Sequence, residues 1–133
     1  MNVMNWTENL TGVQHIGVPT NDIETTIAFY RSLGFDIALR TVNKAANEQV
    51  CFLRLKNLCI ETYQSGCATG KPGAIDHIAL DVQNVEEAFD AVRAGGFKLL
   101  DKAVQSLPFW ENGVRFFTIL GPNSEKIEFC QMM

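Results

Sequence analysis

Hydrophobic and polar residues follow two different periods along the chain. In residues 14–18 they alternate, with Ile16 on one face and His15 on the other, as in a half-buried strand. Apolar residues then recur at helical spacing between Asp22, a natural N-cap, and Gly34, a helix stop. Further strand-like runs cover residues 36–41, 49–56 and 58–63. The pattern predicts a β-α-β-β-β module.

The same order of elements recurs at a shift of 62 residues. Residues 12–35, GVQHIGVPTNDIETTIAFYRSLGF, align without a gap with residues 74–97, AIDHIALDVQNVEEAFDAVRAGGF, so that His15 falls on His77. Asn84 is the predicted N-cap of the second helix. The strands expected after that helix cover residues 98–104, 114–120 and 126–131, and the segment SLPFWENG after the first of them is expected to be irregular. We therefore predict an α+β fold made of two βαβββ modules with curved mixed sheets.

The module boundaries follow from composition. Residues 1–11 show no periodicity and are read as a lead-in, and the Gly-rich stretch QSGCATGKPG separates the two copies. The predicted first module covers residues 12–64, the linker 65–72 and the second module 73–133, and together they form one domain.

Composition excludes several classes of protein. A hydrophobic content of 47% over 133 residues is ample for a packed core, and a net charge of −4 without a Lys/Arg run argues against a nucleic-acid partner. The N-terminal residues lack a basic and an apolar signal region, and no apolar run reaches the roughly 18 residues of a membrane span. We therefore expect a cytoplasmic protein whose four cysteines, without a C-x-x-C spacing, are thiols.

Four residues stand out as candidates for chemistry. His15 and Glu61 belong to the first and last strands of the first module, and His77 and Glu128 take the corresponding places in the second. All four are expected in mid-strand positions, and if each sheet curls into a half-barrel they line one cavity. Two imidazoles and two carboxylates suit a divalent metal ion, whose charge offsets that of both carboxylates.

Each of these residues also has a structural explanation when taken alone. A single strand histidine is more often a hydrogen-bonded core or rim residue than a ligand, and a lone strand glutamate is usually solvated or paired with a cation. Repetition of both residues at matching places favours a shared ligand. Passive inheritance from a duplication remains the alternative.

The segments HIGVPTNDIETTIAFYRSLGF, DHIALDV, LCIETY and GPNSEKIEF resemble the vicinal-oxygen-chelate superfamily over residues 12–131. That superfamily includes glyoxalase I, methylmalonyl-CoA epimerase, extradiol dioxygenases, and fosfomycin- and bleomycin-resistance proteins. The resemblance implies metal ligands on the first and last strands of each module. Carried over to this chain, they are His15, Glu61, His77 and Glu128.

The ligand set narrows the resemblance. Two His and two Glu are similar to short bacterial glyoxalase I, whereas dioxygenases and fosfomycin enzymes use two His and one Glu, and the epimerase typically has Gln where Glu61 stands. The resemblance implies a lactoylglutathione lyase activity through an enediolate, with Glu128 as principal base and Glu61 as its partner. It also implies a Ni²⁺ or Co²⁺ ion, with Zn²⁺ close behind, and a homodimer.

Some features leave the substrate open. Where glyoxalase I usually has an arginine for glutathione shortly after the first histidine, this chain has Val18-Pro19-Thr20, and Ser124 replaces a common glycine. Glutathione, another thiol adduct, or a different α-hydroxycarbonyl compound therefore remain alternatives. So do an epimerase of the methylmalonyl-CoA type and a non-catalytic antibiotic-binding protein, although such binders generally lack the His/Glu set.

Other candidates lie near the expected cavity. Arg54 alternates with the leucines of its strand and would hold a substrate carboxylate, unless it is a solvated rim charge. Phe109 and Trp110 would close over a small-molecule substrate as a lid, or else pack on the rim. Cys59 and Cys130 lie two residues from the glutamates and are expected to be filler rather than ligands.

Overall fold

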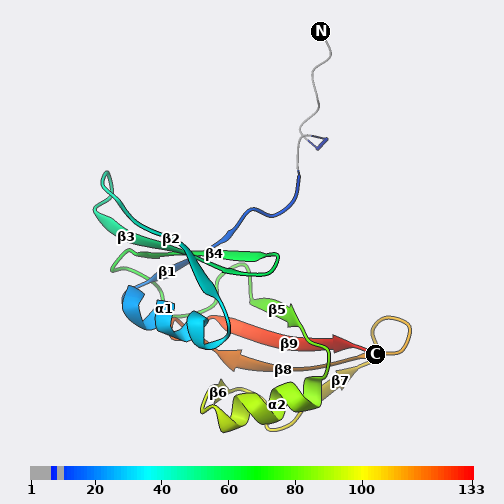
Figure 1. The fold of residues 1–133 in the computed structure, drawn as a ribbon. Coiled ribbons are helices and arrows are strands. Elements are labelled where there is room, and N and C mark those ends of the chain that lie inside the picture. Colours follow the sequence, from blue (N-terminus) through cyan, green and yellow to red (C-terminus); the bar gives the residue numbers. More distant parts are fainter. Residues whose placement is uncertain (1–6, 9–10) are drawn as a thin grey trace. The chain divides into compact units, whose positions relative to one another are not determined.

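The computed structural model describes residues 7–8 and 11–133, and these form two compact units. Unit 1 ends at Cys67 and unit 2 covers Ala68–Met133. Most of the expected lead-in at 1–11 lies outside the described residues. Each unit contains one helix and one sheet, and Figure 1 shows their arrangement within the unit.

Unit 1 has the predicted order of elements. They are β1 (Ile16–Thr20), α1 (Ile23–Ser32), β2 (Asp36–Asn43), β3 (Glu48–Leu55) and β4 (Leu58–Gln64). The sheet has the order β1-β4-β3-β2, in which β1 and β4 are parallel and the other pairs antiparallel.

Unit 2 repeats this plan with one difference. Its elements are β5 (His77–Asp81), α2 (Val85–Ala94), β6 (Lys98–Leu99), β7 (Gln105–Leu107), β8 (Val114–Leu120) and β9 (Lys126–Met132). The sheet has the order β5-β9-β8-β6, with β5 and β9 parallel and β7 also paired with β8. Two helices and two mixed sheets confirm the predicted α+β fold.

The single strand predicted at residues 98–104 is wrong. The chain leaves the sheet after Leu99, and the side chain of Asp101 accepts a hydrogen bond of 2.8 Å from the backbone N–H of Thr118. The Asp101 carboxylate thus takes the place of a backbone carbonyl from a neighbouring strand, because the backbone N–H of Thr118 in β8 needs a hydrogen-bond acceptor. The edge strand resumes as β7, which includes the first residues of the segment expected to be irregular.

The helix ends are confirmed. Asp22 accepts from the backbone N–H of Thr25 at 3.2 Å, and Asn84 accepts from that of Glu87 at 3.1 Å. Beyond the helices, Gly34 and Gly96 have φ angles of 101° and 78°. This left-handed region favours glycine, so the repeat keeps glycine where the chain must turn.

A second contact ties the start of each helix to the last strand of its unit. The backbone N–H of Ile23 donates to Gln64 Oε1 at 2.9 Å, and that of Val85 donates to Gln131 Oε1 at 2.8 Å. Because the first N–H groups of a helix have no partner within the helix, these glutamines supply one. They follow Glu61 and Glu128 by three residues on the same strands.

The core of each unit lies between its helix and its sheet. In unit 1, Tyr30 of α1 is 1% exposed and Leu53 of β3 is fully buried. In unit 2, the Phe89 ring of α2 packs edge-on against Phe117 of β8 at 5.3 Å. The opposite face of each sheet therefore carries the residues that alternate with the core, including both glutamates.

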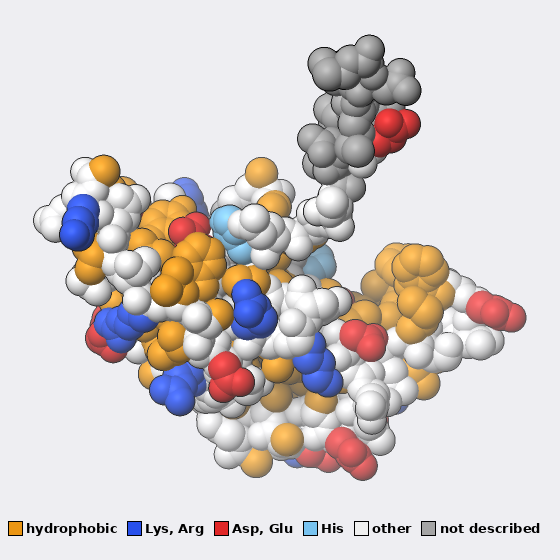
Figure 2. Space-filling view, turned by 45° about the horizontal axis from the view of Figure 1, so that its top comes forward, with side chains coloured by type: hydrophobic (Ala, Val, Ile, Leu, Met, Phe, Trp, Pro, Cys, Tyr) orange, Lys and Arg blue, Asp and Glu red, His pale blue; other side chains and the backbone are white. Residues whose placement is uncertain are grey.

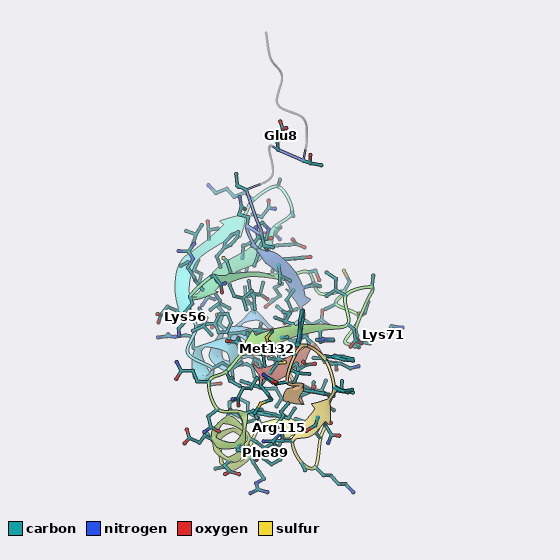
Figure 3. The ribbon with its side chains drawn as sticks, turned by 90° about the vertical axis from the view of Figure 1, so that its right-hand side faces the viewer. Glu8, Lys56, Lys71, Phe89, Arg115 and Met132 are labelled. Carbon is teal, nitrogen blue, oxygen red and sulfur yellow. The ribbon has the colours of Figure 1, made fainter. Side chains whose placement is uncertain are left out.

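Ion pairs join helix and sheet at the surface. Glu24 of α1 pairs with Arg40 of β2, and its equivalent, Glu86 of α2, pairs with Arg115 of β8. Figure 3 labels Arg115. In the space-filling view, cationic, acidic and apolar side chains are interspersed on the face shown (Figure 2). Among the described residues, no helix has the length and apolar character needed to cross a membrane.

Candidate metal centre

In unit 1, His15 and Glu61 lie side by side. The parallel pairing of β1 with β4 sets Gly17 opposite Glu61, and His15 is on the same face two residues earlier. His15 Nε2 is 3.5 Å from Glu61 Oε1, and the two side chains are 34% and 28% exposed. His15 directly precedes β1 rather than lying in mid-strand as expected.

In unit 2, His77 and Glu128 have the same arrangement. The pairing of β5 with β9 sets Ala79 opposite Glu128, with His77 as the first residue of β5. His77 Nε2 is 3.5 Å from Glu128 Oε2, and the side chains are 44% and 18% exposed. The two pairs thus repeat both in sequence and in geometry.

The other ring nitrogen of each histidine faces an oxygen. His15 Nδ1 is 2.9 Å from Gln14 Oε1, and His77 Nδ1 is 3.0 Å from Asp76 Oδ2. A carbonyl or carboxylate oxygen only accepts, so these contacts suit the tautomer in which Nδ1 carries the proton and donates. In a neutral imidazole, Nε2 then presents its lone pair to the glutamate, which is the arrangement of a metal-ligating histidine.

This donor set fits a divalent cation. A lone pair on nitrogen and a carboxylate oxygen at 3.5 Å repel each other unless a positive charge lies near both. Among the residues that the structure describes, no group of three or more His, Cys, Asp or Glu side chains is arranged to hold a metal ion. Each unit thus brings together one pair of predicted ligands, an imidazole nitrogen and a carboxylate oxygen.

Gln14 and Asp76 were missed by the sequence reasoning. They occupy equivalent places in the repeat, directly before the histidines, and this alignment was the signal that could have found them. The hydrogen bond from His77, followed by that from Lys126, holds the pKa of Asp76 below its usual value. Lys126 Nζ lies 3.1 Å from Asp76 Oδ1, whereas Gln14 carries no charge. Asp76 therefore orients its histidine as a carboxylate.

Cys59 and Cys130, on the strands that carry Glu61 and Glu128, are poor candidates for metal ligands. Burial, followed by the nearby charge of Glu128, raises the pKa of the Cys130 thiol. A thiol rather than a thiolate is a poor metal ligand. Cys59 is opposite Arg54 in the pairing of β3 with β4, and all four cysteines are free.

The predicted substrate residues lie in different units. Arg54 is an exposed residue of β3 in unit 1 and lines a pocket that also contains His15. Phe109 and Trp110 are in unit 2, in the loop between β7 and β8, with exposed fractions of 55% and 70%. This loop extends from one end of the sheet of unit 2 (Figure 1). Both aromatic rings are thus largely exposed to solvent.

Comparison with known proteins gives the family. The model of the Glyoxalase/Bleomycin resistance protein/Dioxygenase superfamily matches residues 14–117, and the chain belongs to this superfamily. The uncharacterized protein YwbC of Bacillus subtilis (strain 168) is 30% identical over 125 residues, which cover 90% of this chain and 96% of that protein.

Solved structures share the fold. A glyoxalase family protein from Enterococcus faecalis has a TM-score of 0.78 at 18% identity and covers 92% of this chain and 98% of its own. The fosfomycin resistance protein FosX of Listeria monocytogenes, complexed with Mn(II) and sulfate, has a TM-score of 0.68 at 17% identity, covering 93% and 94%. Both matches cover more than nine-tenths of this chain, so the glyoxalase-like fold includes both units.

Proposed function

We propose that this protein is a metal-dependent isomerase of the glyoxalase I type, which converts the hemithioacetal of methylglyoxal and a small thiol into a thioester. The observation that carries the proposal is the duplicated pair of histidine and glutamate. Both pairs have the same Nε2–Oε distance of 3.5 Å, and both histidines are oriented by an oxygen at Nδ1. Core packing alone does not require a second copy of each feature.

In the proposed site, His15, Glu61, His77 and Glu128 hold one divalent ion. The two carboxylates would balance its charge, and the ion would still accept water or substrate oxygens as further ligands. The ion would stabilise negative charge on the two neighbouring oxygens of the substrate. Ni²⁺ or Co²⁺ is the proposed metal and Zn²⁺ the next choice, and the Mn(II) in the FosX complex adds a fourth metal to test.

Glu128 is the proposed base. The Glu128 side chain is 18% exposed, against 28% for Glu61. Glu128 is therefore better shielded from water that would compete for the proton it takes from the substrate. Glu128 would remove the proton from the carbon bonded to sulfur and oxygen, and a carboxylate would return a proton to the neighbouring carbon. The isomerisation then needs no net acid or base. Glu61 is the proposed partner on the other face of the substrate.

Phe109 and Trp110 are the proposed lid. Their large exposed rings belong to a loop, and closure of such a loop over a substrate removes apolar surface from water and excludes water from the reaction. We further propose a cytoplasmic homodimer. Light scattering on the purified protein should give twice the mass of the chain.

The test is turnover by apo-protein reconstituted with Ni²⁺, Co²⁺, Zn²⁺ or Mn²⁺ in turn. The substrates are methylglyoxal hemithioacetals of glutathione and of simpler thiols. We expect metal-dependent activity that Glu128→Gln lowers by a factor of about 10² to 10⁴ and that Glu87→Gln, an exposed change on α2, leaves intact. Tight metal binding without turnover of any adduct would refute the glyoxalase I assignment and direct the search to epimerase substrates. Failure to bind any metal would favour a non-catalytic binder.

A further inference from the structure

Tyr63 lies on the same face of the unit 1 sheet as Glu61, two residues further along β4. The chain has two tyrosines, and the other, Tyr30, is 1% exposed in the core. Tyr63 is instead half-buried, and the pairing of β1 with β4 sets it opposite Pro19. Its side chain therefore belongs to the sheet face that carries the His15–Glu61 pair rather than to the core.

The ring of Tyr63 lies over Gly17. A Cβ at Gly17 would be 3.6 Å from the ring carbon Cε1 and 3.8 Å from the hydroxyl oxygen of Tyr63. Gly17 is paired with Glu61 and Tyr63 with Pro19, so the Tyr63 ring leans back along β1 by two residues. The Glu61 side chain leans in the same direction, because its Oε1 lies 3.5 Å from His15 Nε2.

This lean brings the Tyr63 hydroxyl towards the His15–Glu61 pair. Gly17 follows His15 by two residues, a separation of about 7 Å in an extended chain, and the two lie on the same face. A hydroxyl group donates to an oxygen at about 2.7 Å. A ligand oxygen held at the pair is therefore within reach of the Tyr63 hydroxyl.

The Tyr63 hydroxyl makes no hydrogen bond to any other described residue. A tyrosine hydroxyl near a buried ring usually has a partner, and it can donate one hydrogen bond. His15 Nε2 and the Glu61 carboxylate present lone pairs on this face, so neither can donate to an oxygen. Tyr63 thus adds an uncharged donor beside two groups that only accept.

Unit 2 has no equivalent donor. Matching the strand registers around Glu61 and Glu128 sets Ala79 at the place of Gly17 and Cys130 at that of Tyr63. A thiol is a weak hydrogen-bond donor, and the cysteine side chain is much shorter than that of tyrosine. The combination of a glycine and a tyrosine therefore occurs once, although the His–Glu pair occurs twice.

We infer that Tyr63 donates a hydrogen bond to the substrate oxygen on which negative charge develops, and that Gly17 leaves the space that its ring needs. This inference rests on the proposed function and adds a catalytic residue to it. A fixed donor aimed at developing charge lowers the barrier. Because the donor is uncharged, it leaves the charge balance between a divalent ion and the two carboxylates unchanged.

Binding of a ligand that mimics the two reacting oxygens is the first test. Acetohydroxamate is planar and carries two neighbouring oxygens, and it is titrated calorimetrically into Zn²⁺-loaded protein. We expect Tyr63→Phe to weaken its binding by about 10- to 100-fold, the usual loss for a hydrogen bond to a charged group. Competition with a chelator should show unchanged Zn²⁺ affinity. A loss of Zn²⁺ affinity of the same size would indicate a structural role and overturn the inference.

Gly17 offers a matched pair of variants. Gly17→Ala adds a Cβ at an ordinary contact distance and should leave acetohydroxamate binding intact, whereas Gly17→Val should displace the ring and weaken binding as Tyr63→Phe does. In the Tyr63→Phe background, Gly17→Val should cause no further loss, because both changes remove the same hydrogen bond. Additive losses would show that Gly17 acts independently of Tyr63 and would overturn its inferred role.

Turnover separates the two proposals. Tyr63→Phe should lower kcat by about a hundredfold at unchanged KM. Equal acetohydroxamate affinity in the wild type and Tyr63→Phe would overturn the role of Tyr63 even if isomerisation of hemithioacetals is normal. So would a failure of every metal form to bind acetohydroxamate. Binding that depends on Tyr63 without turnover of any hemithioacetal would support the role of Tyr63 and refute the glyoxalase I reaction.

Discussion

The two units keep the same His–Glu geometry but distribute their core volume in opposite ways. In unit 1 the sheet contributes two small buried residues, Cys51 and Thr62, which are paired across β3 and β4, and α1 contributes the large buried Tyr30. At the sheet positions of unit 2 equivalent to Cys51 and Thr62, Phe117 and Phe129 stack at 4.8 Å. The position in α2 equivalent to Tyr30 is the smaller Val92.

This difference separates two kinds of constraint. A core needs a total volume, which helix and sheet can share in any proportion as long as packing is dense. A metal ligand needs one atom at one place, and no other layer can supply it. The His–Glu pairs, which we propose as metal ligands, are repeated residue for residue, while the core residues around them are not.

The largest effect is expected from the glutamates. Glu128→Gln should lower kcat by a factor of about 10² to 10⁴, the usual contribution of a catalytic base, and Glu61→Gln by about tenfold. Steady-state kinetics with saturating metal would measure both. Equal losses in the two variants would contradict the assignment of Glu128 as principal base, and a larger loss in Glu61→Gln would reverse the roles.

A core substitution should also distinguish the units. Phe117→Ala removes a fully buried ring that contacts both Phe89 and Phe129, and should lower the free energy of unfolding by about 3–5 kcal/mol. Cys51→Ala, at the equivalent buried position, should cost about 1 kcal/mol because it removes one atom. Urea denaturation measures both. Similar losses would show that the sheet positions carry equal packing in the two units.

A smaller effect is expected from the residues that orient the histidines. Asp76→Ala and Gln14→Ala should each weaken metal binding by about 10- to 100-fold, as loss of such partners typically does. Asp76→Ala should have the larger effect, because a carboxylate is the stronger acceptor. Competition with a metal chelator measures the affinity. Unchanged affinity in both variants would mean that these contacts do not serve the metal.

The smallest effect concerns Thr62. Its Oγ1 is buried and has no hydrogen-bond partner among the described residues, whereas the equivalent position in unit 2 is the apolar Phe129. Thr62→Val should therefore stabilise the protein by up to about 1 kcal/mol, because it removes an unsatisfied hydroxyl of similar size. A rise in the urea midpoint at an unchanged slope would confirm this. A fall would imply an additional partner for the hydroxyl.

The elements that sequence predicts well are those with a local signal. Asp22, Asn84, Gly34 and Gly96 mark helix ends because capping and left-handed turns depend on single residues. The break at Asp101 was not foreseen, because its partner Thr118 lies 17 residues away on another strand. The roles of Gln14 and Asp76 also emerge from side-chain geometry, since neither residue type is distinctive on its own.

The glutamines at the ends of β4 and β9 have a consequence for how the chain folds. Each completes the first turn of a helix from 41 or 46 residues away, so the helix start and the last strand must come together. Contacts of such separation form late and slow the search for the native state. Protection of the Ile23 and Val85 amides from hydrogen exchange should therefore appear together with that of β4 and β9. Protection of the Ile23 or Val85 amide would then indicate that β4 or β9, the strand that carries Glu61 or Glu128, has come together with the start of its helix.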